Sequence, residues 1–233
     1  MTVAKRVKSL IKSAFPRGVT IYRKASRAWR NHSLASVFSE IYRKNLWQNS
    51  ESVSGRGSTL ERTDVMRYRL PLLLQELKAQ TLFDAACGDF NWMRLTKIAE
   101  AINYIGADIV PDLIAQDQRL YAGQARAFLV LDITRDRIPT VDIILCRDCL
   151  NHLSFRHARD AIANFKKSGS TYLLSTTHAN VEENRDISSG GWRPLNLQLP
   201  PFSFPKPVEL IVEDNELGKC LGLWQLEDFQ HPT

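Results

Sequence analysis

Two apolar runs, each ending in polar residues, constrain the fold of this chain more than any other feature. The first leads into a turn of small residues, Leu82-Phe83-Asp84-Ala85-Ala86-Cys87-Gly88-Asp89, and the second is Tyr104-Ile105-Gly106-Ala107-Asp108. A buried strand, a tight turn, a helix and a second strand that ends in a carboxylate form one βαβ unit of a doubly wound sheet. In such a unit the turn lets a ligand approach the backbone, and the acid binds ribose hydroxyls. The sequence therefore predicts an α/β fold with a ligand site at this edge of the sheet.

The rest of the chain continues the alternation of strands and helices. Its strands are continuous apolar runs, which is typical of a parallel sheet covered on both faces. Two final apolar segments, 208–213 and 219–226, are separated by too few residues for a crossover helix, so we expect them to pair antiparallel. The predicted fold class is α/β, a doubly wound, seven-stranded Rossmann-like sheet with five parallel strands and a C-terminal antiparallel hairpin. The parallel strands are expected near 81–86, 103–108, 126–131, 141–146 and 170–177, and helices near 91–101, 111–121 and 155–167.

Another helix is expected ahead of the first strand. Ser58 followed by Glu61 has the form of a capping box, and the helical pattern then runs to Leu77. The residues before this helix, 54–59, are expected to form a flexible loop. Pro71 lies inside the pattern and is expected to break or kink the helix, because proline lacks the amide that a helix interior needs.

The basic residues are concentrated at the N-terminus. Residues 1–60 hold 12 lysines and arginines against two glutamates, whereas 61–233 hold 19 basic and 23 acidic residues. We therefore divide the chain into a basic, partly helical N-terminal extension, 1–50, and a domain, 51–233. The extension fits a solvated arm, a peripheral contact with a membrane surface, or an RNA clamp. A nucleic-acid partner is disfavoured, because the body of the protein is not basic.

Composition also limits the location of the protein. No apolar run reaches the roughly 20 residues that a membrane span requires, and no signal-peptide pattern is present at the N-terminus. The four cysteines are too few for a disulfide framework, which favours a reducing compartment. We predict a cytoplasmic protein, with the inner face of the membrane as an alternative location for the basic extension.

The first turn resembles a motif of class I S-adenosylmethionine-dependent methyltransferases, an acid followed by a Gly-Cys-Gly turn. Ala86 and Phe90 stand where the usual first and third glycines would be. Phe90 counts against the three-glycine dinucleotide turn, and so favours S-adenosyl-L-methionine over NAD as the cofactor. The resemblance implies a donor site made of Asp84, Cys87, Gly88, Asp89, Asp108, Ile109, Asp132, Ile133 and Arg147.

Some of these residues have specific roles in the donor site that the resemblance implies. Asp108 would bind the ribose and Asp132 would lie beside the adenine. Asp84 or Asp89 would receive the ammonium group, and the N-terminus of the helix at 91–101 would receive the carboxylate.

Candidate catalytic residues follow the fourth and fifth strands. Asp148 and His152 are four residues apart, so one helical turn would place both on one face. The carboxylate would orient the imidazole and favour its protonated form; either residue is a candidate base, and His178 is another. The pair Cys146 and Cys149 lacks the second motif that a zinc site needs, so no metal is expected.

A polar loop after the fifth strand offers acceptor-binding side chains. Trp192 has a flat face on which a sugar ring can stack, Arg193 is a forked donor, and Asn196 can pair with hydroxyls. The alternative is an ordered structural loop with Trp192 as its anchor.

From residue 54 to the C-terminus the chain resembles small bacterial sugar O-methyltransferases. Four phrases carry the resemblance, at 87–93, 146–150, 191–196 and 221–224. These enzymes act on surface polysaccharides and on rhizobial lipochito-oligosaccharides, and include a nodulation fucose 2-O-methyltransferase. The resemblance implies methyl transfer to a sugar hydroxyl of a glycan or glycolipid acceptor. The alternatives are an RNA methyltransferase, and a non-catalytic donor-binding partner of a glycosyltransferase.

Overall fold

The structure, a computed structural model, describes residues 32–215 and 218–229. The expected membrane or RNA contact of the basic extension rests on residues before 32 and lies outside the described residues. No helix in the described ranges is long and apolar enough to cross a membrane.

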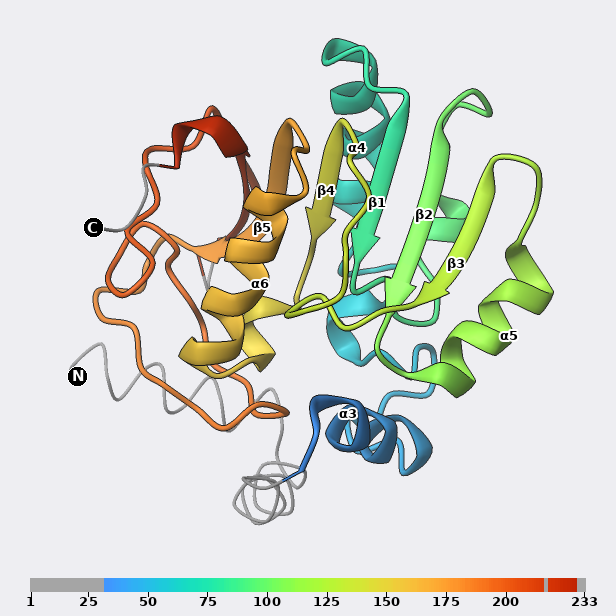
Figure 1. Cartoon of the computed structure of the whole chain (residues 1–233), viewed down its shortest axis with the longest axis horizontal. Helices are drawn as coiled ribbons and strands as arrows, with labels where there is room; N and C mark the ends of the chain where they lie inside the picture. Colours follow the sequence, from blue (N-terminus) through green and yellow to red (C-terminus); the bar gives the residue numbers. More distant parts are fainter. Residues whose placement is uncertain (1–31, 216–217, 230–233) are drawn as a thin grey trace.

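The core of the molecule is a seven-stranded sheet with strand order β3-β2-β1-β4-β5-β7-β6 (Figure 1). The first five strands are parallel, whereas β7 pairs antiparallel with both β5 and β6. The predicted fold class is therefore confirmed, and the strands lie within about two residues of their expected positions. Their bounds are Thr81–Ala85 for β1, Asn103–Asp108 for β2, Arg126–Val130 for β3, Ile143–Cys146 for β4, Tyr172–His178 for β5, Glu209–Asp214 for β6 and Lys219–Gln225 for β7.

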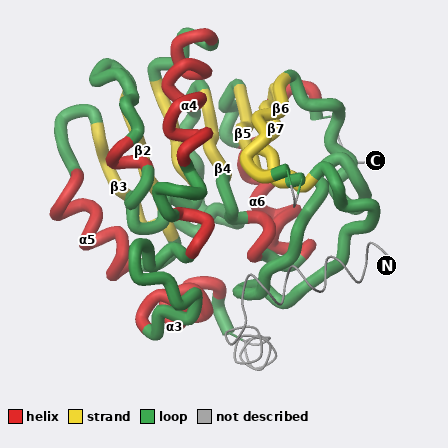
Figure 2. Tube along the Cα trace, turned by 180° about the vertical axis from the view of Figure 1, so that it is seen from behind, coloured by secondary structure: helices red, strands yellow, loops and turns green. Residues whose placement is uncertain are grey.

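Helices cover both faces of the sheet (Figures 1 and 2). One apolar cluster joins the sheet to α4 (Asp64–Glu76) and α5 (Pro111–Tyr121), and the other joins its opposite face to α6 (Phe155–Lys167). Local signals fix the beginnings of these helices. Pro111 occupies the first turn of α5, and the Ser154 hydroxyl caps α6 by accepting a hydrogen bond from the amide of His157.

A further helix, α3 (Leu34–Arg43), lies at the end of the sheet where the parallel strands terminate (Figure 1). The Ser33 hydroxyl caps it by accepting from the Ser36 amide. Leu34 is buried in the apolar cluster between the sheet and α6, whereas Val37 and Ile41 form a separate buried cluster with Leu46 and Trp47. Part of the segment assigned to the N-terminal extension thus covers the carboxyl ends of the strands.

The prediction of a helix at 91–101 is wrong. The chain forms only a short 3₁₀ turn there, η3 (Met93–Leu95). The Thr96 hydroxyl donates to the carbonyl of Trp92, the group that an α-helix would pair with the Thr96 amide, and that amide instead bonds to Met93. A side chain that competes with the backbone in this way ends a helix before it can extend.

The helix ahead of β1 begins later than expected and is not broken by its proline. α4 begins at Asp64, so Ser58 and Glu61 do not form its capping box, and Ser58 belongs to the 3₁₀ turn η2 (Arg56–Ser58). Pro71 lies within α4, which continues to Glu76.

Candidate functional site

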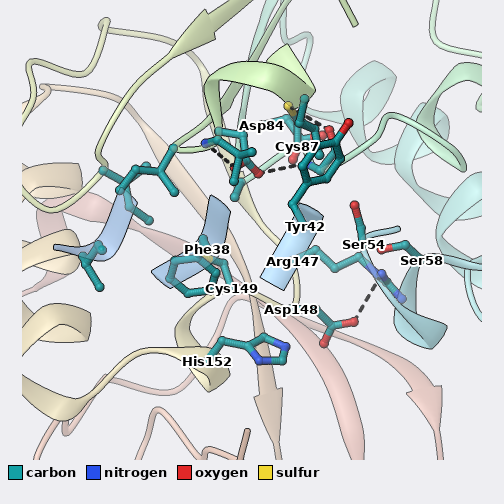
Figure 3. A pocket seen from close by; sticks show the side chains of 18 of the residues that line it. Phe38, Tyr42, Ser54, Ser58, Asp84, Cys87, Arg147, Asp148, Cys149 and His152 are labelled. Carbon is teal, nitrogen blue, oxygen red and sulfur yellow. Dashed lines mark hydrogen bonds and ion pairs between the residues drawn. The ribbon is translucent and has the colours of Figure 1, made fainter. Parts of the chain in front are cut away.

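A cavity lies at the carboxyl ends of β1, β2 and β4, beneath α3 and the 47–58 segment (Figure 3). It holds about 1030 Å³ of space, part of it open to solvent. Most of the residues predicted for the donor site, together with Asp148 and His152, line it. Its wall consists of Leu34, Phe38, Tyr42, Trp47, Val53, Ser54, Ser58, Asp84, Ala86, Cys87, Gly88, Trp92, Asp108, Ile109, Val110, Leu113, Leu131, Asp132, Ile133, Thr134, Arg147, Asp148, Cys149, His152 and Leu153.

Asp84, at the end of β1, is a buried carboxyl group in the cavity wall. Burial raises its pKa to about 7, although the hydroxyl of Tyr104, which donates to it at 2.7 Å, opposes the shift. A buried carboxylate with so little compensation is stabilised by a cation placed beside it. This end of the cavity therefore favours a positively charged group.

Asp108 ends β2 and faces the same cavity. Its two oxygens accept backbone hydrogen bonds from Val110 at 3.0 Å and Gly88 at 3.3 Å. Burial nevertheless raises its pKa to about 6. Each carboxylate oxygen can accept more than one hydrogen bond, so Asp108 keeps capacity for hydroxyl groups of a ligand.

The cavity wall next to Asp108 holds the remaining predicted adenosine contacts. Ile109, Asp132 and Ile133 line it, as does the buried thiol of Cys87. One oxygen of Asp132 accepts from the Thr134 amide at 3.0 Å and the Thr134 hydroxyl at 2.6 Å, which holds the loop after β3. The structure thus brings these residues to one wall.

Asp89 does not line the cavity, contrary to its predicted role as a partner for the ligand. Its carboxylate accepts hydrogen bonds from the Ser52 hydroxyl at 3.0 Å, the Val53 amide at 2.9 Å and the Ser54 hydroxyl at 3.2 Å. It fastens the 52–54 loop over the first turn. Gly88 adopts a left-handed φ of 58° beneath that loop, and a Cβ atom there would overlap the Ser54 hydroxyl, so glycine is required.

Phe90 occupies the position of the usual third glycine of the turn. It has a left-handed φ of 55°, and its ring packs against Tyr104, Tyr121 and Phe128 at centroid distances of 5.1 to 5.2 Å. The side chain therefore fills the space between the sheet and α5. Only the short 3₁₀ turn η3 follows, so the α-helix N-terminus expected to bind the donor's carboxylate is not available.

Arg147 and Asp148 belong to a buried ionic cluster that also contains Glu213 and Lys219 of the C-terminal hairpin. The guanidinium of Arg147 contacts Glu213 at 2.9 Å and Asp148 at 3.3 Å, and Lys219 contacts both carboxylates. Burial alone would raise the pKa of Asp148, but the two cations hold it well below its usual range. Asp148 is therefore a permanently ionised group and a poor base.

Asp148 and His152 do not share a helical turn. Asp148 has a left-handed φ of 53°, stabilised by the Thr176 hydroxyl, which accepts from its amide at 2.9 Å. His152 ends the 3₁₀ turn η4 (Leu150–His152). Both nevertheless lie at the end of the cavity away from Asp84 and Cys87, as Figure 3 shows.

His152 is oriented by a backbone carbonyl rather than by the expected carboxylate. Its Nδ1 lies 2.8 Å from the oxygen of Gly191, a partner that can only accept, so Nδ1 carries the proton and Nε2 keeps its lone pair. Burial lowers the pKa of His152 to about 4, although Gly191 and Asp148 oppose the shift. The predicted protonated form is therefore disfavoured, and the neutral imidazole is suited to act as a base.

The other polar residues predicted to act lie outside the cavity wall. His178 is buried, and its Nδ1 accepts from the amide of Leu195 at 3.2 Å. The guanidinium of Arg193 donates to the Leu150 carbonyl at 3.1 Å and stacks over the ring of Phe155.

Asn196 and Trp192 also make contacts within the protein. Asn196 bonds through its side chain to the backbone of Val181 and Gln198, and the ring of Trp192 packs edge-on to His178. The structure uses this loop to support η4.

Sequence reasoning missed the part of the wall that comes from residues 34–58. Phe38 and Tyr42 reach the cavity from α3, and Trp47 lies beside His152 with ring centroids 5.2 Å apart. The signal was present as apolar residues at positions 34, 37, 38, 41 and 42, the spacing of a helix with one buried face.

Comparison with known proteins relates this architecture to solved structures. No protein-family model and no curated protein matches the sequence. Human N-acetylserotonin methyltransferase, solved with S-adenosylmethionine, matches with a TM-score of 0.58 at 13% identity, over 91% of this chain and 67% of its own.

Two bacterial structures match at a similar level. The N-methyltransferase NodS of Bradyrhizobium japonicum WM9, with S-adenosyl-L-homocysteine, has a TM-score of 0.57 at 16% identity, over 79% of this chain and 97% of its own. The 1,6-didemethyltoxoflavin-N1-methyltransferase of Burkholderia thailandensis has a TM-score of 0.56 at 16% identity, over 82% and 86% of the two chains. The chain has the Rossmann-like methyltransferase fold.

Proposed function

We propose that this protein is an S-adenosylmethionine-dependent O-methyltransferase that acts on a sugar hydroxyl of a bacterial glycan. One observation carries the proposal. A single cavity joins two buried carboxyl groups at adjacent strand ends, Asp84 and Asp108, to a neutral, oriented imidazole, His152. The carboxyl groups suit a cationic nucleoside, and the imidazole suits a hydroxyl group that must lose a proton.

The residues present fit S-adenosylmethionine. Asp84 is buried, and its pKa is raised although Tyr104 and the charge of Arg147 oppose the shift, so an ammonium group beside it would remove an electrostatic cost. Asp108 has free acceptor capacity for ribose hydroxyls, and the apolar side chains of Ile109 and Ile133 suit the faces of an adenine ring. We assign the donor to the wall formed by these four residues.

In the mechanism that we propose, His152 is the base. When bound, S-adenosylmethionine supplies a methyl carbon to the acceptor oxygen, and the electron pair of the broken carbon–sulfur bond stays on sulfur. The Nε2 atom of His152 takes the proton that the acceptor hydroxyl loses, and Gly191 stabilises the imidazolium through Nδ1. A positioned base of this kind contributes about 10² to 10⁴-fold to a rate.

The sugar acceptor is the finer part of the proposal. It is supported by the resemblance of residues 54–233 to bacterial sugar O-methyltransferases and by the polar pair Asp148 and His152 at one end of the cavity. A sugar hydroxyl is weakly acidic, so a neutral base beside it has a clear function. We infer that the acceptor is a surface polysaccharide or a lipochito-oligosaccharide such as a fucosylated one.

Three experiments test the proposal at its two levels. Calorimetry of the purified protein with S-adenosylhomocysteine should show binding that the Asp84→Asn variant weakens, and absence of binding to the wild type would reject the donor. Incubation with methyl-labelled donor and nitrophenyl α-L-fucopyranoside should yield a methylated glycoside. Mass spectrometry of surface glycans from a deletion strain should show the loss of one methyl group, and an unchanged glycan profile would reject the sugar acceptor.

A further inference from the structure

We propose that Trp47 is an acceptor-binding residue, and that it selects acceptors with an oxygen atom next to the hydroxyl that is methylated. This inference rests on the proposed function and concerns the end of the cavity occupied by His152. Trp47 comes from the segment between α3 and η2, not from the loop at 190–196 where a stacking tryptophan was predicted.

The position of the Trp47 ring is the first observation. The ring lines the cavity and lies 5.2 Å from the His152 ring, at an interplanar angle of 45°. Gly55 allows its backbone to lie close to Trp47, because a Cβ atom on that glycine would lie 3.3 Å from the Cβ of Trp47. Val37 and Ile41 of α3 form the buried cluster against which the indole packs. The ring is therefore fixed beside the base before any acceptor binds.

The indole N–H is the second, independent observation. It is buried and has no hydrogen-bond partner among residues 32–215 and 218–229, which the structure describes. Tryptophan side chains in folded proteins usually find a partner for this group, since burying it unpaired is costly. An acceptor oxygen that enters the cavity would supply the missing partner. An apolar ring alone would leave it unpaired.

The chemistry of the neighbouring groups narrows the class of acceptor. Nε2 of His152 can accept only one proton, from the hydroxyl that reacts. Asp148 directs one oxygen to Lys219 and Arg147. In the described part of the chain, its other oxygen accepts a long hydrogen bond of 3.4 Å from Asn151. A base, a carboxylate oxygen that can accept from a second hydroxyl, and an N–H donor at the edge of an aromatic ring together match a pyranose. One hydroxyl reacts, and oxygen atoms next to it pair with Asp148 and with the N–H at the edge of the Trp47 ring.

The test compares Trp47→Phe with the wild type. Phenylalanine keeps an aromatic face but removes the N–H donor, and Trp192→Phe is the matched control outside the cavity wall. The probe is methyl α-L-fucopyranoside with its 3-deoxy analogue. Trp47→Phe should raise the KM for the fucoside by about tenfold with little change in affinity for S-adenosylhomocysteine. The 3-deoxy analogue should show a much smaller difference between the two proteins.

A binding measurement gives a readout apart from turnover. In a ¹⁵N–¹H spectrum of the indole groups, the signal that Trp47→Phe lacks should move when the fucoside is added to the complex with S-adenosylhomocysteine.

Methylation of the fucoside with equal KM values and an unmoved signal would overturn the role of Trp47 and leave the sugar function standing. Donor binding without methylation of any glycoside would reject the sugar function and this inference together. Equal activity on a simple phenol and on the fucoside would also overturn it, because a phenol has no neighbouring oxygen.

Discussion

His152 and Gly191 are joined across 39 residues by a 2.8 Å contact between the imidazole Nδ1 and a backbone carbonyl. The contact fixes the tautomer, because a carbonyl oxygen can only accept. A second hydrogen bond joins the loop at 190–196 to His152, because the amide of Gly190 donates to the carbonyl of His152 at 2.9 Å. The loop at 190–196 therefore acts on the proposed chemistry through the orientation of one ring.

The pH dependence of turnover should reflect the burial of His152. Its pKa is lowered to about 4 and its neutral form is the active one, so kcat should fall only as the pH drops through about 4 and stay level above that. The measurement is kcat against pH with saturating donor, which separates this step from donor binding. A limb between pH 6 and 7 that disappears in His152→Gln would mean that the imidazole is far more exposed to solvent than the structure shows.

Replacement of His152 should damage chemistry rather than donor binding. His152→Gln should lower kcat by about 10² or more while the affinity for S-adenosylhomocysteine changes little. Asp148→Asn is the matched comparison, because that carboxylate is held ionised by two cations and should not serve as the base. A larger loss of kcat in a folded Asp148→Asn protein than in His152→Gln would exchange their roles.

Donor affinity should increase as the pH rises toward neutrality. Burial raises the pKa of Asp84 to about 7, so below that pH the free protein carries a neutral carboxyl group that attracts a cation weakly. The dissociation constant for S-adenosylhomocysteine should fall by up to about tenfold per pH unit between pH 5.5 and 7. Calorimetry should show the trend in the wild type and its loss in Asp84→Asn. The range ends at pH 7 because the Asp84 carboxyl group ionises near that pH and an α-amino group loses its own proton near pH 8.

The clamp between Asp89 and the 52–54 loop should control donor affinity from outside the cavity. Asp89→Ala removes four hydrogen bonds to a carboxylate, each worth roughly 1.5–3 kcal/mol. Three of them hold the loop that carries Ser54, and the fourth comes from the Asn91 amide. Donor binding should weaken at least tenfold, and amide exchange should increase in residues 52–58. Asp89→Asn keeps the shape of the side chain and some of its hydrogen bonds. Its donor affinity and its amide exchange should therefore lie between those of the wild type and those of Asp89→Ala. Unchanged exchange in the Ala variant would show that other contacts hold the loop.

The sequence predicts the sheet well, but it predicts poorly the segment at 34–58 that lies over the cavity. Strands such as Ile143–Cys146 are apolar runs that can be recognised in the sequence, and Asp84 and Asp108 meet because adjacent parallel strands end at one edge. The sequence could not predict that the helix after the first turn is limited to residues 93–95. That outcome depends on whether the hydroxyl or the amide of Thr96 donates to the carbonyl of Trp92. Helical spacing shows that α3 buries one face but not which surface receives it, so Trp47 could not be placed.

Side-chain direction explains the other misses. Because Arg193 lies in a polar loop, the sequence predicts that its side chain is exposed. In the structure the side chain is buried over Phe155 and donates to the Leu150 carbonyl. That choice depends on how the loop at 190–196 packs under η4, which no local pattern encodes. Asp148 likewise reads as a free acid until the hairpin of β6 and β7 brings Lys219 and Glu213 to it.

The buried ionic cluster should make the C-terminal hairpin essential for stability. The side chain of Glu213 is 2% exposed and lies 3.2 Å from Lys219 and 2.9 Å from Arg147. Breaking such a buried group by removing one partner typically costs about 3–5 kcal/mol, because a charge is left without compensation. Glu213→Gln should therefore lower the free energy of unfolding by about that amount in urea titrations. The double variant Glu213→Gln, Lys219→Met removes one charge of each sign, so it should recover part of the loss. A double variant that is less stable than the sum of the two single changes would mean that packing rather than charge balance sets the stability of this cluster.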